Sequence, residues 1–257
     1  MKQTEMVSIV IPVYGLEHLI RETMDYVRAQ TYTDWELILV DDRSPDTSAD
    51  LIEQYCREYP GCRIRLLRQE RNRGPALARN RGVEAAEGRY LAFLDGDDIW
   101  EPDKLRRELE FLKEKDAAFV FMSYEFAEPD GHGTGRIAHA PETLTYREAL
   151  RNTTIFTSTV MFDLEKIPKE KLRMPDMKSE DTALWWSLLR EGITAYGLDE
   201  TLVRYRRPAP GQKSLSSNKV EALRRIWNLY RKAEHLSVPR SMGNFVLWAV
   251  NAVRRRL

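Results

Sequence analysis

The chain has 257 residues, of which 42% are hydrophobic and 31% are charged. This length and composition suit one large α/β domain, or one such domain with a helical appendage. Its 40 lysines and arginines balance 40 aspartates and glutamates, so no overall basic field favours nucleic acid, and we expect no nucleic-acid partner.

Strands and helices alternate regularly through the first half of the chain. Short apolar runs predict strands over residues 7–12, 36–42, 63–67 and 90–94. Apolar residues at helical spacing predict helices over 16–30, 47–59, 75–87 and 102–115. This alternation predicts a Rossmann-like, mostly parallel α/β sheet with helices on both faces.

The second half is less regular. The predicted elements are a strand at 118–127, an edge loop at 128–141, a short helix at 146–151, a strand at 158–162, a helix at 180–191 and strands at 194–198 and 202–205. The tail is helical from Lys219 onward. We therefore expect an α/β domain over 1–218 and a C-terminal helical extension over 219–257.

No feature of the sequence indicates export. The N-terminus enters a strand without a signal-peptide pattern, and no apolar run reaches membrane-spanning length. Cys56 and Cys62 lack the neighbours that would complete a zinc site. We expect a reduced, cytoplasmic protein.

Common nucleotide-binding loops are missing from the sequence. The segment after the first strand, 12–18, has one glycine rather than Gly-x-Gly-x-x-Gly, which disfavours a Rossmann dehydrogenase. No Gly-x-x-x-x-Gly-Lys-Ser/Thr occurs either, which disfavours a P-loop NTPase.

Acidic residues follow the fourth predicted strand. Its apolar run ends in Asp95, Asp97 and Asp98, at the strand end where open α/β sheets bind ligands. Three neighbouring carboxylates repel one another unless a cation or protons offset them, and oxygen ligation suits Mg²⁺ or Mn²⁺. The alternative is a solvated turn before the helix that starts near Pro102.

Polar residues also follow the first two strands. Tyr14 could stack on a base, and Asp41 or Asp42 could accept hydrogen bonds from a base or from ribose hydroxyls. With a cation on the later carboxylates, these groups would form a nucleoside-diphosphate site without a glycine-rich loop. The alternative for the two aspartates is helix capping.

Two later segments have both a functional and a structural interpretation. Asp181 opens a helix and could act as a general base, or it could compensate the helix dipole. The cationic segment 204–217 could close over a diphosphate, or it could be an ordinary solvated loop.

Together these pieces resemble the inverting glycosyltransferases of family 2, which have the glycosyltransferase A fold. The match runs from Val7 to about Asn218. It is carried by the motifs at 7–14, 29–36, 40–44, Gly74 with 78–80, 88–90, the Asp-Gly-Asp-Asp at 95–98, and 180–185.

The resemblance implies a role for each residue of a donor site. Pro12 and Tyr14 would flank the nucleobase, and Asp42 would bind the uracil edge. Arg79 and Asn80 would shape the donor pocket.

The resemblance also implies where the reaction occurs. Asp95 would lie near the ribose and sugar and join Asp97, the main metal ligand, while Asp181 would be the catalytic base. Gly96, where serine is commoner, should change little, whereas Arg43 could alter the rim of the pocket.

The implied activity is metal-dependent, with Mn²⁺ or Mg²⁺. A sugar would pass from a UDP-sugar to a hydroxyl of a saccharide or polyprenyl-linked acceptor in bacterial teichuronic acid, capsule or exopolysaccharide synthesis. The alternatives are a sugar-nucleotide-binding protein without turnover and a sugar-nucleotide nucleotidyltransferase. A hydrolase would instead need paired acid and base carboxylates.

The tail carries many basic residues, and apolar residues at helical spacing over 240–257. Such a helix could lie on the inner face of the plasma membrane, as in a peripheral enzyme. It could equally pack on the catalytic domain, or on a second subunit in a homodimer.

Overall fold

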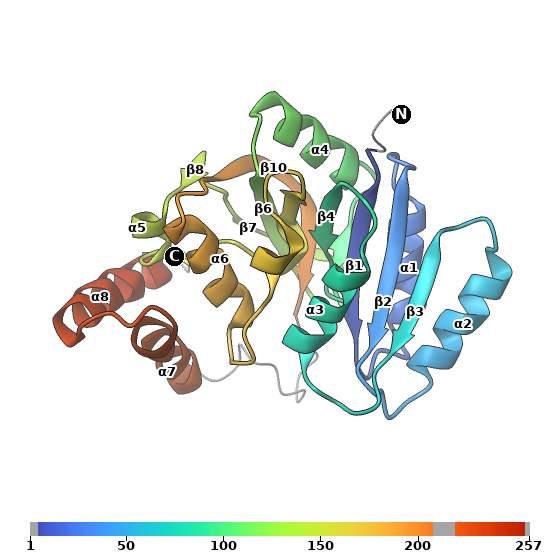
Figure 1. Cartoon of the computed structure of the whole chain (residues 1–257), viewed down its shortest axis with the longest axis horizontal. Coiled ribbons are helices and arrows are strands. Elements are labelled where there is room, and N and C mark those ends of the chain that lie inside the picture. The colour runs from blue at the N-terminus through green and yellow to red at the C-terminus, as the bar shows by residue number, and fades with distance from the viewer. Residues whose placement is uncertain (1–4, 208–218, 255–257) are drawn as a thin grey trace.

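The structure, a computed structural model, describes residues 5–207 and 219–254 (Figure 1). Within the last helix, side chains are described up to Ala252. The cationic loop predicted at 204–217 lies outside the described residues from 208 onward.

One mixed sheet of ten strands organises the described residues, in the order β3-β2-β1-β4-β9-β6-β10-β5, with β7 beside β6 and β8 beside β10. The strands are β1 Val7–Val13, β2 Trp35–Asp41, β3 Ile64–Arg68, β4 Tyr90–Phe93, β5 Ile99–Trp100, β6 Phe119–Ala127, β7 Gly133–Ala138, β8 Thr143–Leu144, β9 Val160–Asp163 and β10 Ala195–Arg206.

Helices cover both faces of this sheet (Figure 1). They are α1 Ile20–Arg28, α2 Ser48–Glu58, α3 Pro75–Ala85, α4 Lys104–Glu114, α5 Tyr146–Ala149, α6 Glu180–Arg190, α7 Lys219–Asn228 and α8 Val238–Arg254. Short 3₁₀ turns span Thr157–Thr159 and Lys169–Leu172, and a π-helical turn spans Leu229–Ala233.

The sheet separates two apolar cores. Along β1, Val10 packs in the core under α3 and α6, whereas Ile9 and Ile11 pack in the core under α1, α2 and α4. Successive strand side chains point to opposite faces, so a strand covered on both faces must be apolar throughout. This explains the continuous apolar runs of the first two strands.

The predicted parallel sheet is confirmed, with exceptions in the second half. β1, β2, β3 and β4 are mutually parallel, but β9 pairs antiparallel with both β4 and β6. The two strands predicted at 194–198 and 202–205 form one strand, β10, whose pairing with β6 shifts register after Leu198 and again after Thr201.

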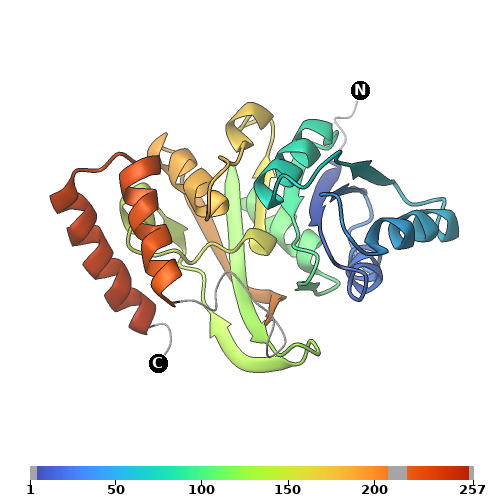
Figure 2. The same ribbon diagram turned by 90° about the horizontal axis from the view of Figure 1, so that it is seen from below.

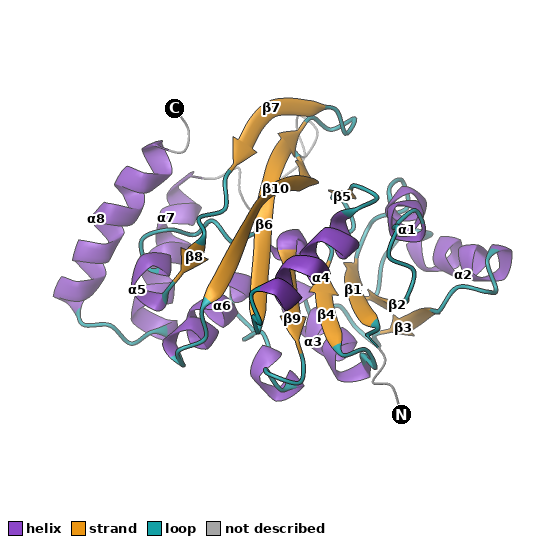
Figure 3. Ribbon diagram, turned by 90° about the horizontal axis from the view of Figure 1, so that it is seen from above, coloured by secondary structure: helices purple, strands orange, loops and turns teal. Residues whose placement is uncertain are grey.

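The prediction of a loop over 128–141 is wrong, because β7 lies within it and pairs with β6. This strand projects beyond the main sheet with β6 and β10 (Figure 3). Its side chains alternate between exposed and partly exposed, so it carries no apolar pattern by which a strand could be recognised.

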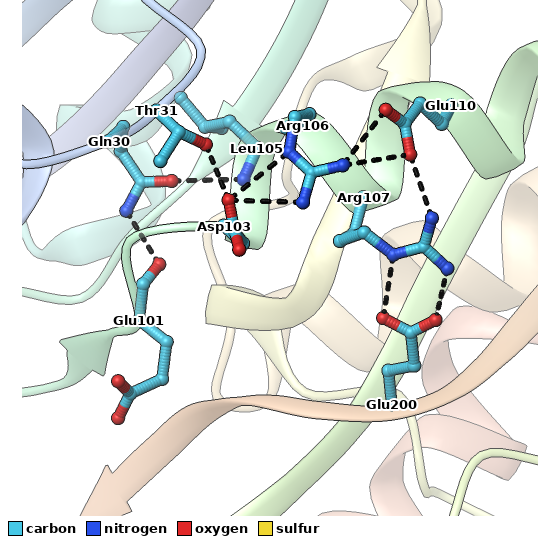
Figure 4. A network of polar contacts seen from close by, with 9 residues as sticks. All are labelled: Gln30, Thr31, Glu101, Asp103, Leu105, Arg106, Arg107, Glu110 and Glu200. Atoms are coloured by element: carbon cyan, nitrogen blue, oxygen red, sulfur yellow. Dashed lines mark hydrogen bonds and ion pairs between the residues drawn. The ribbon is translucent and has the colours of Figure 1, made fainter.

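Polar contacts hold α4 in place (Figure 4). The side chain of Gln30 accepts a hydrogen bond from the Leu105 amide at 3.0 Å, and Thr31 donates to Asp103 at 2.6 Å. Arg107 pairs with Glu200 of β10. The loop that carries the acidic residues is therefore anchored at its far end.

The C-terminal helices pack on the α/β domain beside α5 and α6, at the end of the molecule opposite α2 (Figure 1). Tyr230 stacks on Trp186 with ring centroids 5.3 Å apart. Glu234 accepts hydrogen bonds from Tyr146 at 2.5 Å and from Arg190 at 2.7 Å. These contacts support the interpretation that the C-terminal helices pack on the α/β domain. The boundary at 219 stays a prediction.

None of the described helices combines the length and apolar character needed to cross a bilayer.

An ion pair is fully buried within α4. Lys104 Nζ lies 2.5 Å from Glu108 Oε2 and 4.0 Å from the centre of the Trp100 ring. Burial lowers the pKa of Lys104 and raises the pKa of Glu108 to about 7, although each partner opposes the shift of the other. Each charge is therefore tolerated only because of the other.

We predict that Lys104→Met lowers the free energy of unfolding by about 3–5 kcal/mol, because it leaves Glu108 buried without a partner. The double variant Lys104→Met/Glu108→Leu should recover most of this loss. In the single variant, burial keeps the pKa of Glu108 above its ordinary value of 4.5, so stability should fall as pH rises from about 4.5 to above 7. Denaturant unfolding at several pH values tests this, and equal losses in the single and double variants would contradict it.

Candidate active site

The predicted site residues gather at one edge of the sheet. β1, β2 and β4 are parallel and end at Val13, Asp41 and Phe93, so the segments that follow them emerge together (Figure 1). A cavity of about 750 Å³ opens there. Its volume is in the range of small-molecule sites.

Asp98 is a buried anchor of the acidic turn. It is 1% exposed, and its carboxylate accepts hydrogen bonds from the Ser158 hydroxyl at 2.5 Å and from the Arg206 amide at 3.3 Å. The same hydroxyl accepts from the Asp95 amide at 3.0 Å. Burial, and then Asp97 and Asp95, raise the pKa of Asp98 well above its usual value. Asp98 therefore orients the turn rather than capping a helix.

Asp97 opens onto the cavity. It makes no ion pair with a described residue and no hydrogen bond to another one. The surrounding side chains withdraw Asp97 partly from water, and this burial, together with the charge of Asp95, raises the pKa of Asp97 to about 6. The positive charges of Arg206 and Arg79 oppose this shift. An added positive charge at this point would relieve the repulsion between the two carboxylates.

Arg79 links three parts of the site. This side chain on α3 is 5% exposed and lies 2.5 Å from Asp95 and 2.9 Å from Glu180. Burial opposes its charge, but Asp95 and Glu180 outweigh burial and raise its pKa. Its Nε has no hydrogen-bond partner among the described residues.

Asp181 lies on the same cavity, in the first turn of α6. Its Oδ2 accepts a hydrogen bond from the Thr157 hydroxyl at 3.1 Å, and its Oδ1 accepts from the Thr182 amide at 2.6 Å. Ser179, just before the helix, adopts a left-handed conformation with φ of 60°. That conformation costs roughly 1–2 kcal/mol in a non-glycine residue, and strain of this kind gathers at functional sites.

Asp42 is held by the loop that follows β3. It is 3% exposed, and its Oδ1 accepts from the Gln69 side chain at 2.7 Å and from the Arg73 amide at 2.8 Å, while Oδ2 accepts from the Gly74 amide at 2.7 Å. Asp42 does not cap a helix in this arrangement. The uracil contact predicted for it stays a prediction.

The other predicted donor residues differ in their accessibility. Tyr14 is 53% exposed beside Gly15, which lines the cavity, while Pro12 is partly buried in β1. Asn80 is 4% exposed. Its side chain donates a hydrogen bond to the Met174 backbone carbonyl at 2.8 Å and accepts one from the Met174 backbone amide at 2.7 Å. Asn80 is not one of the cavity-lining residues, so any effect on the pocket would be indirect.

The two departures from the family pattern also have structural settings. A Cβ atom at Gly96 would lie 2.2 Å from Leu16 Cδ1, so Leu16 fills the space that a serine would need. The flexible end of Leu16 could move, which keeps the expected effect small. Arg43 is exposed and has a left-handed φ of 60°.

Sequence reasoning missed several residues of this site. Thr157 and Ser158 support the aspartates from about 24 and 60 residues away in sequence, and no local pattern marks such partners. Trp248 and Arg225 line the cavity from the C-terminal helices, which the sequence had set apart as an extension.

The described residues contain no group of three or more His, Cys, Asp or Glu side chains placed to hold a metal ion. The carboxylates that face the cavity are oxygen donors of the kind that Mg²⁺ and Mn²⁺ prefer. Asp97, and Asp95 beside it, could therefore supply part of a coordination shell whose remaining oxygens come from a ligand or water.

Comparisons with known proteins agree on one family. The profile of the family "Glycosyl transferase family 2" matches residues 8–165. The putative teichuronic acid biosynthesis glycosyltransferase TuaG of Bacillus subtilis is 42% identical over 253 residues, which cover 98% of both chains. The UDP-Glc:alpha-D-GlcNAc-diphosphoundecaprenol beta-1,3-glucosyltransferase WfgD of Escherichia coli is 34% identical over 87% of this chain and 85% of its own.

Solved structures show the same fold. TarS 1-349 of S. aureus in complex with UDP-GlcNAc superimposes with a TM-score of 0.69 and 20% identity, over 95% of this chain and 71% of that one. The mannosyltransferase PcManGT of Pyrobaculum calidifontis in complex with GDP-Man and Mn²⁺ gives a TM-score of 0.68 and 16% identity, over 96% and 75%. With this fold and the family match, the chain belongs to glycosyltransferase family 2 and is an inverting glycosyltransferase of the glycosyltransferase A fold.

Proposed function

We propose that this enzyme transfers a sugar from a UDP-sugar to a hydroxyl of a lipid-linked saccharide, in the synthesis of a bacterial surface polysaccharide, with the help of Mn²⁺ or Mg²⁺. The observation that carries the proposal is that one cavity holds the open carboxylate of Asp97 and the oriented carboxylate of Asp181. By their names, TuaG is a putative glycosyltransferase of teichuronic acid biosynthesis, and WfgD is a glucosyltransferase that acts on UDP-Glc and a diphosphoundecaprenol-linked GlcNAc.

We assign binding of the uracil base of the donor to the segment after β1 and to Asp42. Tyr14 is exposed enough to stack on a base. Each carboxylate oxygen can accept two hydrogen bonds, and Oδ2 of Asp42 accepts one from the described residues. Asp42 can therefore receive the uracil N–H while the loop after β3 continues to fix its orientation.

The diphosphate of the donor is assigned to the acidic turn. Asp97 would hold the divalent cation, and Asp95, already held by Arg79, would lie between the cation and the sugar. When bound, the cation offsets the negative charge that grows on the departing nucleoside diphosphate. Asp98, bonded to Ser158 and Arg206, keeps the turn in place without touching substrate.

Asp181 is assigned the proton from the acceptor hydroxyl. Oδ1 accepts from the amide and the hydroxyl of Thr182, and Oδ2 accepts only from Thr157, so the carboxylate is held in orientation while Oδ2 can still accept a proton. The hydroxyl oxygen forms a bond to C1 of the sugar as the bond to the diphosphate breaks on the opposite side. One base and one displacement invert the anomeric carbon.

The two alternatives are less well supported. A binding protein without turnover would be indicated if Asp97 or Asp181 faced away from the cavity, and both line it. Nucleotidyltransfer is disfavoured because the family match is to glycosyltransferases.

We place the enzyme in the cytoplasm, at the inner face of the plasma membrane, and infer contact through the described part of 240–257. Met242, Val246 and Val250 are 50, 53 and 43% exposed and recur every four residues on α8, with the exposed Arg240 near its start. Such a helix face suits an anionic lipid surface. A homodimer through the same face is the competing arrangement.

We predict that Asp181→Asn lowers kcat by about 10²–10⁴-fold with little change in the KM of the donor, because the base acts in the transition state. UDP release from a panel of UDP-sugars with a saccharide acceptor measures this. Asp176→Asn, an exposed aspartate a few residues earlier, is the matched control. Full activity in the Asp181 variant would remove this residue from the mechanism.

We predict that EDTA abolishes UDP release and that Mn²⁺ restores it in the native enzyme. In Asp97→Asn, restoration should need at least about tenfold more Mn²⁺, because a charged ligand has become neutral. Titration calorimetry of Mn²⁺ with UDP present measures the affinity directly. Undiminished release in EDTA would show that no divalent cation takes part.

We predict that the protein sediments with anionic vesicles at low salt and that Val246→Asp/Val250→Asp abolishes this, because charges on the apolar face of α8 resist insertion. Vesicles of phosphatidylcholine alone should bind weakly. If light scattering shows that the same variant instead changes a dimer to a monomer, the face is a subunit interface.

A further inference from the structure

Three hollows meet along α7, and they share residues. The catalytic cavity includes Ala222, Arg225 and Ile226 in its wall. A second hollow of about 460 Å³ begins at Arg225; we call it the cationic hollow, and it is lined by Met177, Lys178, Val220, Glu221, Arg224, Arg225, Asn228 and Lys232. A third, of about 470 Å³, is the apolar groove, lined by Leu223, Arg224, Trp227, Asn228, Met242 and Phe245.

The cationic hollow is suited to an anion. Four of the eight side chains that line it are lysine or arginine, and one is an acid, Glu221, which pairs with Lys178. Arg224 and Lys232 are exposed at its surface. Arginine is the residue that binds phosphate oxygens through paired N–H groups, so a phosphate or diphosphate is the ligand that this chemistry favours.

The apolar groove lies between α7 and α8, which run side by side at one end of the molecule (Figure 2). Leu223 is 41% exposed and Met242 is 50% exposed on its walls. Trp227 and Phe245 pack edge to face with ring centroids 6.0 Å apart. Exposed apolar surface in a groove of this kind indicates a binding site for an apolar ligand.

We propose that α7 and α8 bind the lipid diphosphate of the acceptor, with the diphosphate in the cationic hollow and the start of the polyprenyl chain in the apolar groove. This inference rests on the proposed function, and it says which part of the enzyme binds the acceptor. The three hollows follow one another through Arg225 and then Arg224. The catalytic cavity, the cationic hollow and the apolar groove therefore follow one another in the same order as the saccharide, the diphosphate and the lipid of such an acceptor.

The arrangement favours a single lipid over a flat bilayer surface as the occupant. A bilayer would meet cations and apolar residues on an exposed face, whereas here the cations line a hollow next to the catalytic cavity. The apolar groove would hold only part of a long chain, and the remainder would stay in the membrane that α8 contacts.

The binding test uses the full chain with EDTA present, so that no divalent cation can hold a diphosphate at the acidic turn. Calorimetry measures the Kd of three probes: farnesyl diphosphate, farnesol and inorganic pyrophosphate. We expect farnesyl diphosphate to bind more tightly than either of the others, because it alone fills both hollows.

Substitutions should separate the two parts of the site. Leu223→Ser/Met242→Ser should weaken the binding of farnesyl diphosphate and of farnesol by about tenfold and leave the binding of pyrophosphate unchanged. Ile137→Ser is the matched control, since Ile137 is 40% exposed on β7. It should change none of the three.

The cationic hollow should show the opposite pattern. Arg224→Gln/Lys232→Gln should weaken the binding of farnesyl diphosphate and of pyrophosphate by about tenfold and leave the binding of farnesol unchanged. Arg57→Gln/Arg71→Gln, at exposed arginines on α2 and in the loop after β3, is the matched control. Both pairs remove two positive charges, so a nonspecific charge effect would appear equally in each.

Three results would overturn the proposal. One is equal affinity for farnesyl diphosphate in the native protein and in both double variants. Another is loss of binding of the Arg224→Gln/Lys232→Gln variant to anionic vesicles that contain no diphosphate lipid, to the same extent as its loss of farnesyl diphosphate binding. The third is a change of oligomeric state in the groove variant with farnesyl diphosphate binding intact, which would make the groove an interface between two copies.

Failure of this inference is distinguishable from failure of the proposed function. Transfer to a lipid-free saccharide without farnesyl diphosphate binding would keep the function and reject the lipid site. The predicted binding pattern without sugar transfer from any UDP-sugar would keep the lipid site and reject the function.

Discussion

The contact on which the site depends most is the ion pairing of Arg79 with Asp95 and Glu180. It joins α3, the turn after β4 and the start of α6, which are separated by 16 and 101 residues in sequence. Because the guanidinium is buried, its charge depends on these two carboxylates, which together outweigh the cost of burial. The position of Asp181 relative to Asp97 is therefore fixed by an interaction in which neither takes part, and the distance between the proposed base and the proposed diphosphate site depends on α3.

The sequence predicted the half of the molecule in which structure is local. Alternating apolar runs and helical spacings identified β1 to β4 and their helices, and parallel pairing then placed Tyr14, Asp42 and Asp97 at one edge. It could not predict that β9 inserts antiparallel between β4 and β6. Ser158, just before β9, depends on that insertion, because only there does its hydroxyl reach Asp95 and Asp98.

The tail shows a second limit of sequence reasoning. A basic amphipathic pattern predicts a helix and one apolar face, but not what that face contacts. In the structure α7 contributes Ile226 to the core shared with α6, and the π-helical turn after it contributes Leu229, while α7 also forms part of the cavity wall. Because one helix forms part of the core, part of the cavity wall and part of the exposed surface, its apolar residues follow no simple spacing along the sequence. Only the tertiary packing distinguishes these roles.

The clamp around Asp42 has a consequence for how this family can diversify. Two of its three hydrogen bonds come from backbone amides, those of Arg73 and Gly74. Backbone donors do not depend on side-chain identity, so Glu70 and Arg71 in the same loop can be exchanged without moving the carboxylate, whereas Asn72 accepts a further hydrogen bond from the Gly74 amide at 3.2 Å. The restriction falls on Gly74, whose φ of 85° suits glycine alone. The loop can thus acquire new surface contacts during evolution while the position of the Asp42 carboxylate is kept.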